Sequence, residues 1–141
     1  MKMLNVAFCC ALLVLATSCF FGDKVGNKRK FLLTLPPHEQ SAFPSAAGSP
    51  AVREALRLID SVLVREGMVA NSNPPPSATN AVAYYSKDAA NCKIYLTDGS
   101  ITVVCFEYSR GVSSADFDGW TGVLQQELKH HYGAQNVKAA R

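Results

Sequence analysis

Cys92 and Cys105 are the two residues whose types and spacing most directly allow chemistry with each other, namely disulfide formation. They close two β-rich runs around Asp98-Gly99, and Asp-Gly is a strong hairpin signal because both residues tolerate the positive φ of a tight turn. A two-residue turn there places Cys92 opposite Cys105 in a non-hydrogen-bonded pair, whose Cα atoms lie about 4.5 Å apart, a separation that a disulfide spans. The alternatives are a disulfide and two free thiols in the core.

The other titratable side chains do not form a recognisable catalytic or metal-binding motif. His130 and His131 are adjacent, and neighbouring side chains on a helix diverge by about 100°, which makes a poor joint metal site; His38 is distant in sequence. The sequence has no nucleophile elbow, glycine-rich phosphate loop or paired zinc cysteines. Glu107 is either a buried carboxylate with a raised pKa or a strand-end residue that pairs with Arg110 or water. We therefore expect no catalytic residue, no metal and no cofactor.

Alternation along the hairpin divides its residues between two faces. One face is aliphatic and should meet the helices: Cys92, Ile94, Leu96, Ile101, Val103 and Cys105. The other mixes aromatic and polar residues: Lys93, Tyr95, Thr102, Val104, Phe106 and Tyr108. The mixed face is either solvated or receives a partner, and the candidate partner-binding residues on it are Tyr95, Phe106 and Tyr108.

Two amphipathic helices should cover the aliphatic face. The first begins with Ser49 as N-cap before Pro50, and the second with Ser113 or Ser114 as N-cap. Their apolar residues recur at helical spacing: Val52, Ala55, Leu56, Ile59, Val62 and Leu63 in the first, and Phe117, Trp120, Val123 or Leu124, Leu128 and Tyr132 in the second. Gly67 and Gly133 are the expected ends.

The remaining strands complete the expected fold. Phe31–Leu35 and Ala81–Lys87 read as strands, with Met68-Val69 and Asn136–Lys138 as short additions, and the proline-rich stretch Asn71–Thr79 is a stiff surface loop. The order predicts an α+β two-layer domain, in which an antiparallel meander sheet of three to five strands carries both helices on one face.

The N-terminus has the features of a secretory signal. Lys2 precedes an apolar run from Leu4 to Leu15, which is shorter than the roughly 20 residues of a membrane-spanning helix. The following stretch, Leu15-Ala16-Thr17-Ser18-Cys19, resembles the lipobox of bacterial lipoproteins over residues 1–19. That resemblance implies that residues 1–18 are removed as a signal peptide and that Cys19 carries a diacylglycerol and an acyl chain such as palmitate.

The lipobox resemblance also implies a compartment. Phe20 stands where an aspartate often signals inner-membrane retention, so the expected location is the outer membrane, facing the periplasm, with the bilayer as partner of Cys19. In that oxidising space the two thiols left after lipidation of Cys19 should pair, which predicts a Cys92–Cys105 disulfide. Residues 19–30 then read as a lipidated basic tether and residues 31–141 as a single domain.

The charge of the chain bears on its partners. The net charge is +3, but residues 31–141 alone have nine basic and ten acidic residues, so the body is close to neutral. A near-neutral, exported domain argues against nucleic acid as partner. We expect a non-catalytic binding or assembly module of the bacterial envelope, with an unidentified envelope protein as partner. The alternatives are an immunity lipoprotein that neutralises a toxin protein in the periplasm, and a small envelope hydrolase.

Overall fold

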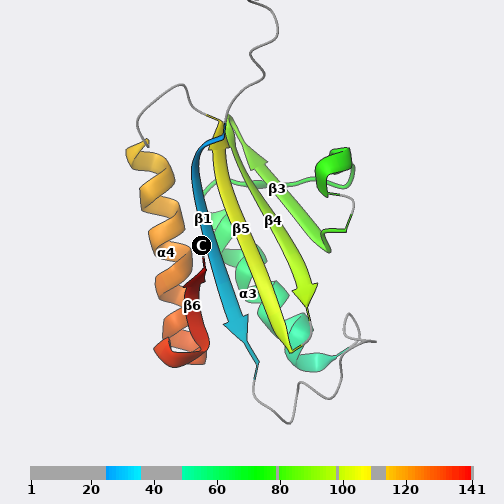
Figure 1. Cartoon of the computed structure of the whole chain (residues 1–141), viewed down its shortest axis with the longest axis vertical. Coiled ribbons are helices and arrows are strands. Elements are labelled where there is room, and N and C mark those ends of the chain that lie inside the picture. The colour runs from blue at the N-terminus through cyan, green and yellow to red at the C-terminus, as the bar shows by residue number, and fades with distance from the viewer. Residues whose placement is uncertain (1–24, 36–48, 79, 98, 109–113, 141) are drawn as a thin grey trace, which may run out of the picture.

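The computed structural model describes residues 25–35, 49–78, 80–97, 99–108 and 114–140 as an antiparallel sheet with two helices on one face (Figure 1). The strand order is β2-β3-β4-β5-β1-β6. The strands are β1 (Val25–Thr34), β2 (Val69–Ala70), β3 (Ala83–Lys87), β4 (Ala90–Thr97), β5 (Ser100–Tyr108) and β6 (Val137–Ala140). The helices are α3 (Pro50–Arg65) and α4 (Ala115–Tyr132), with short 3₁₀ turns η3 (Pro76–Ala78) and η4 (Ala134–Asn136). The α+β class is confirmed, but the sheet has six strands rather than three to five.

The first strand starts earlier than the sequence predicts. β1 begins at Val25 and pairs with β5 along its length, and its second half also pairs with β6. The prediction that residues 25–30 belong to a tether was therefore wrong. The lysines of this stretch are tolerated in a strand because alternation turns Lys28 and Lys30 away from the helices, while Arg29 on the helix side pairs with Asp118.

The β4–β5 hairpin has the predicted register. Thr97 faces Ser100, and the ladder continues without a slip to Cys92 opposite Cys105. The preceding connection is tighter than the predicted Asp88–Asn91 turn, because β4 already starts at Ala90 and Asp88 adopts a positive φ of 51°. The aliphatic face of the hairpin therefore points to the core as expected.

The core lies between the sheet and the two helices. Pro50 opens α3 as predicted, although the Ser49 side chain makes no capping bond. Ser114 caps α4 by accepting a hydrogen bond from Phe117 N. Trp120 is only 2% exposed and joins one continuous cluster with residues of both helices and of β1, β4 and β5. In the part of the chain that the structure describes, no helix has the length and hydropathy needed to cross a membrane.

Candidate binding face of the sheet

The candidate site lies on the side of the sheet that the helices leave uncovered, which we call the open face (Figure 1). In Figure 1 this side is turned to the viewer, with α3 behind the strands. Strand pairing and alternation place these residues on it: Lys28, Lys30 and Leu32 on β1; Tyr84 and Ser86 on β3; Asn91, Lys93 and Tyr95 on β4; Thr102, Val104, Phe106 and Tyr108 on β5; Lys138 and Ala140 on β6.

A hollow of about 340 Å³ opens on this face. Its lining comes from three strands and from the loop that contains η3: Lys28, Ser77, Lys93, Tyr95, Val104, Phe106 and Tyr108. The three residues that the sequence singled out for partner binding, Tyr95, Phe106 and Tyr108, thus meet around one hollow. The sequence analysis did not identify Ser77, because a loop residue carries no periodic signal that links it to a sheet face.

Phe106 is the most buried of the aromatic residues that line the hollow, and we call its ring the floor. The edge of its ring meets the ring of Tyr108, with centroids 5.3 Å apart and planes at 89°. Lys93 Nζ lies 4.9 Å from the centre of the Phe106 ring, within range of a cation–π contact. Phe106 is only 6% exposed, although it lies on the sheet face that neither α3 nor α4 covers. The hollow therefore contains a buried, apolar ring that contacts both Tyr108 and Lys93.

Lys93 also contacts the η3 loop, which forms one wall of the hollow. Its Nζ donates to the backbone O and to Oγ of Ser77, both at 3.1 Å, which ties the η3 loop to β4. Burial lowers the pKa of Lys93, since the ammonium has lost part of its hydration. The lysine thus connects the wall to the floor and places a cation between them.

Two phenols of this face, those of Tyr84 and Tyr95, have a raised pKa. Burial raises the pKa of Tyr84, with a smaller contribution from Tyr108, and burial alone raises the pKa of Tyr95. Tyr84 donates a short hydrogen bond to Asn91 Oδ1. Neutral phenols can both donate and accept hydrogen bonds, so the rim of the hollow offers polar contacts beside its aromatic floor.

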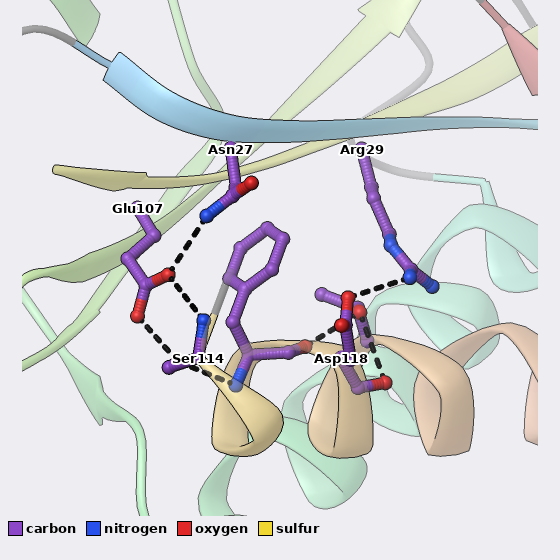
Figure 2. A network of polar contacts seen from close by, with 7 residues as sticks. Asn27, Arg29, Glu107, Ser114 and Asp118 are labelled. Carbon is purple, nitrogen blue, oxygen red and sulfur yellow. Dashed lines mark hydrogen bonds and ion pairs between the residues drawn. The ribbon is translucent and has the colours of Figure 1, made fainter. Parts of the chain in front are cut away.

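On the opposite side of the sheet, Glu107 joins the end of β5 to the start of α4 (Figure 2). Its carboxylate accepts from Ser114 Oγ at 2.5 Å, from Ser114 N at 3.3 Å and from Asn27 Nδ2 at 3.1 Å. The Ser114 side-chain bond lowers the pKa of Glu107, with further help from Ser114 N and Asn27 and against the effect of burial. The alternative of a raised pKa was wrong because these donors favour the charged form. Arg110, the other expected partner, is outside the described residues.

The hydrogen bonds of Glu107 hold the start of α4 in place. The same Ser114 Oγ that donates to Glu107 also accepts from Phe117 N at 3.0 Å, so the carboxylate fixes the N-cap of α4. Arg29 and Asp118 add an ion pair of 2.7 Å between β1 and α4 (Figure 2). These contacts anchor α4 to β5 and β1 and leave the carboxylate turned away from the open face.

Cys92 and Cys105 meet on the helix side of the hairpin. Both side chains are fully buried as thiols, and their Sγ atoms are 3.7 Å apart. Burial raises the pKa of Cys105, and the hydrogen bond to Cys92 acts in the same direction. The predicted register is confirmed, whereas the disulfide stays a prediction for oxidising conditions. Cys19, the predicted lipidation site, lies outside the described residues.

The histidines are separated from the hollow. His131 Nε2 lies 3.5 Å from Glu54 Oε1 on the helix side, and His130 lines a different depression on α4. His38 lies outside the described residues. Over the described ranges, no cluster of three or more His, Cys, Asp or Glu side chains could hold a metal ion.

Comparison with known proteins identified no related protein. No protein-family model matches this chain, and no curated protein matches it. The functional argument therefore depends on the open face and on the N-terminal motif.

Proposed function

We propose that this chain is a non-catalytic, lipid-anchored protein of the bacterial envelope that binds another protein through the open face. The observation that carries the proposal is the hollow, where Tyr95, Phe106 and Tyr108 meet on the sheet face that α3 and α4 leave uncovered. Exposed aromatic groups with an ordered apolar floor are typical of binding surfaces rather than of solvated sheet faces.

The lipobox-like stretch Leu15–Cys19 supports the anchoring part of the proposal. Acyl chains contribute about 0.8 kcal/mol per buried methylene, so two or three chains give lasting attachment. Phe20 after the cysteine favours the outer membrane and its periplasmic side. A partner of the open face is then an envelope protein or a toxin that reaches the periplasm.

The early start of β1 limits the distance between the proposed lipid anchor and the sheet. Only residues 20–24 separate Cys19 from Val25, the first residue of β1. At no more than about 3.6 Å per residue, the chain spans roughly 20 Å between the acylated cysteine and the sheet. The partner must therefore be accessible close to the membrane surface.

Anchoring is tested by comparing the wild type with Cys19→Ser. The wild type should partition into detergent and show a lipidated N-terminal Cys19 by mass spectrometry, whereas the variant should remain in the aqueous phase. An unmodified Cys19 in the mature wild type would show that the anchoring proposal is wrong.

Binding through the open face is tested by site-specific photocrosslinking in the native cells. A benzophenone side chain in place of Tyr95 should give a discrete protein adduct. The matched control places the same group at Val64, which is 53% exposed on α3 on the other side of the molecule. Absence of an adduct at position 95, or an equal adduct at position 64, contradicts binding through the open face.

A further inference from the structure

The charges of the sheet are divided between its two sides. The strands contain these basic residues: Lys28, Arg29, Lys30, Lys87, Lys93 and Lys138. Glu107 is their single acidic residue among the positions that the structure describes, and it lies on the helix side. Arg29 and Lys87 also lie on the helix side, where they pair with Asp118 and Asp116.

The open face is therefore cationic. Its charged residues within the described strands are Lys28, Lys30, Lys93 and Lys138. Among the described residues none of these four lysines pairs with a carboxylate. On the helix side, by contrast, Arg29, Arg65 and Lys87 have acidic partners at 2.7 to 3.1 Å. A surface with one sign of charge around an aromatic hollow is complementary to an anionic ligand that also carries apolar groups.

We propose that the open face binds an acidic, extended segment of the partner protein, with carboxylates at Lys28 and Lys30 and an apolar or aromatic side chain in the hollow. This inference rests on the proposed function and specifies the chemistry of the partner. Lys28 and Lys30 are two positions apart on one strand, so their side chains are about 6.6 Å apart along it. Alternate side chains of an extended segment have the same spacing, which allows two carboxylates to meet the two lysines.

The burial of Phe106 within the hollow favours a protein segment over a lipid bilayer. Phe106 is 6% exposed and lies beside a wall that the two Lys93 bonds to Ser77 hold in place. A flat membrane surface can reach Lys28 and Lys30, but it cannot enter a hollow that is bounded by the η3 loop. A single side chain from a peptide can enter it and contact the phenylalanine ring.

The test is selection of a displayed library of random 12-residue peptides against the mature protein in detergent. The selected peptides should be enriched in Asp and Glu together with apolar residues. Binding should weaken about tenfold in Lys28→Glu/Lys30→Glu, because two exposed ion pairs become repulsive, and it should weaken with added salt. The matched control is Arg53→Glu/Arg57→Glu, which makes the same charge change on α3 and should bind the peptides as the wild type does.

Two results overturn the inference. One is a selected set without acidic enrichment, and the other is unchanged peptide binding by Lys28→Glu/Lys30→Glu. If the selected peptides lack acidic residues while phosphatidylglycerol vesicles bind the wild type and not this variant, a bilayer occupies the face instead. Failure here is distinguishable from failure of the proposed function, because the crosslink from position 95 reports a protein partner whatever its charge.

Discussion

The two sides of one sheet differ in what their residues contact. On β5, Ile101, Val103 and Cys105 have no exposed surface and pack under the helices, whereas Val104 and Tyr108 on the alternate positions face outward. Charges follow the same division, since Arg29 is paired on the helix side and Lys28 has no carboxylate partner among the described residues. Neighbouring residues of one strand therefore differ in role. Those on the helix side stabilise the fold, and those on the open face belong to the surface that we propose as a binding site.

The comparison is not simply between buried and exposed residues. Thr102 and Phe106 lie on the open face and are nevertheless buried, and the Phe106 ring is in contact with Tyr108 and Lys93. If a partner binds there as we propose, side chains that are already packed lose little conformational entropy on binding. The following predictions test this division, beginning with the largest expected effect.

Trp120→Ala should have the largest effect on stability. The indole is 2% exposed and packs edge-on against Phe117, with ring centroids 5.3 Å apart. Its removal should lower the free energy of unfolding by about 3 to 5 kcal/mol. Urea melts should be followed by far-UV circular dichroism, because Trp120 is the only tryptophan of the chain and its fluorescence is lost. A loss below about 1 kcal/mol would contradict its place in the core.

The Cys92–Cys105 pair should provide the next largest effect. Oxidation should stabilise the protein by up to about 3 kcal/mol, and by less if the hairpin is already closed in the unfolded chain. Reductant should lower the unfolding free energy of the wild type but leave Cys92→Ala/Cys105→Ala unchanged. Thiol labelling of the denatured, unreduced mature protein should find no reactive thiol. Two labelled thiols per chain would show that both cysteines remain free.

Glu107→Gln should cost about 1 to 3 kcal/mol at neutral pH, because it weakens the charged hydrogen bonds that fix the cap of α4. The pKa of Glu107 is lowered in the folded state, so its contribution is fully present above the ordinary value of 4.5 and is lost as pH falls through the folded value. The difference between wild type and variant in urea melts should therefore shrink towards acid pH. Glu54→Gln, an exposed substitution on α3, is the control; a difference that is constant with pH contradicts this linkage.

Features that depend on local sequence signals were predicted correctly, whereas features that depend on long-range pairing were not. The hairpin register and both helices were predictable because turn residues and apolar periodicity are local signals, and they correctly placed Tyr95, Phe106 and Tyr108 on one face. The start of β1 was missed because Lys28 to Lys30 resemble a solvated spacer, whereas tertiary pairing with β5 makes them a strand. Asn27 was missed as a partner of Glu107 because it is distant in sequence and is brought near only by that pairing.

Tyr95→Ala should have the smallest effect on stability and a clear effect on binding. The ring is partly exposed at the rim of the hollow, so its loss opens no internal cavity and should change the free energy of unfolding by less than about 1 kcal/mol. Affinity for the acidic peptides should nevertheless fall about tenfold, since aromatic residues at the centre of an interface commonly contribute more than 1 kcal/mol. Urea melts and fluorescence anisotropy with one labelled peptide measure the two effects on the same preparation, and Val64→Ala on α3 should change neither. A stability loss as large as that of Trp120→Ala would show that Tyr95 belongs to the core. Unchanged affinity would show that Tyr95 is not part of the binding site. Either result would contradict the division between the two faces of the sheet.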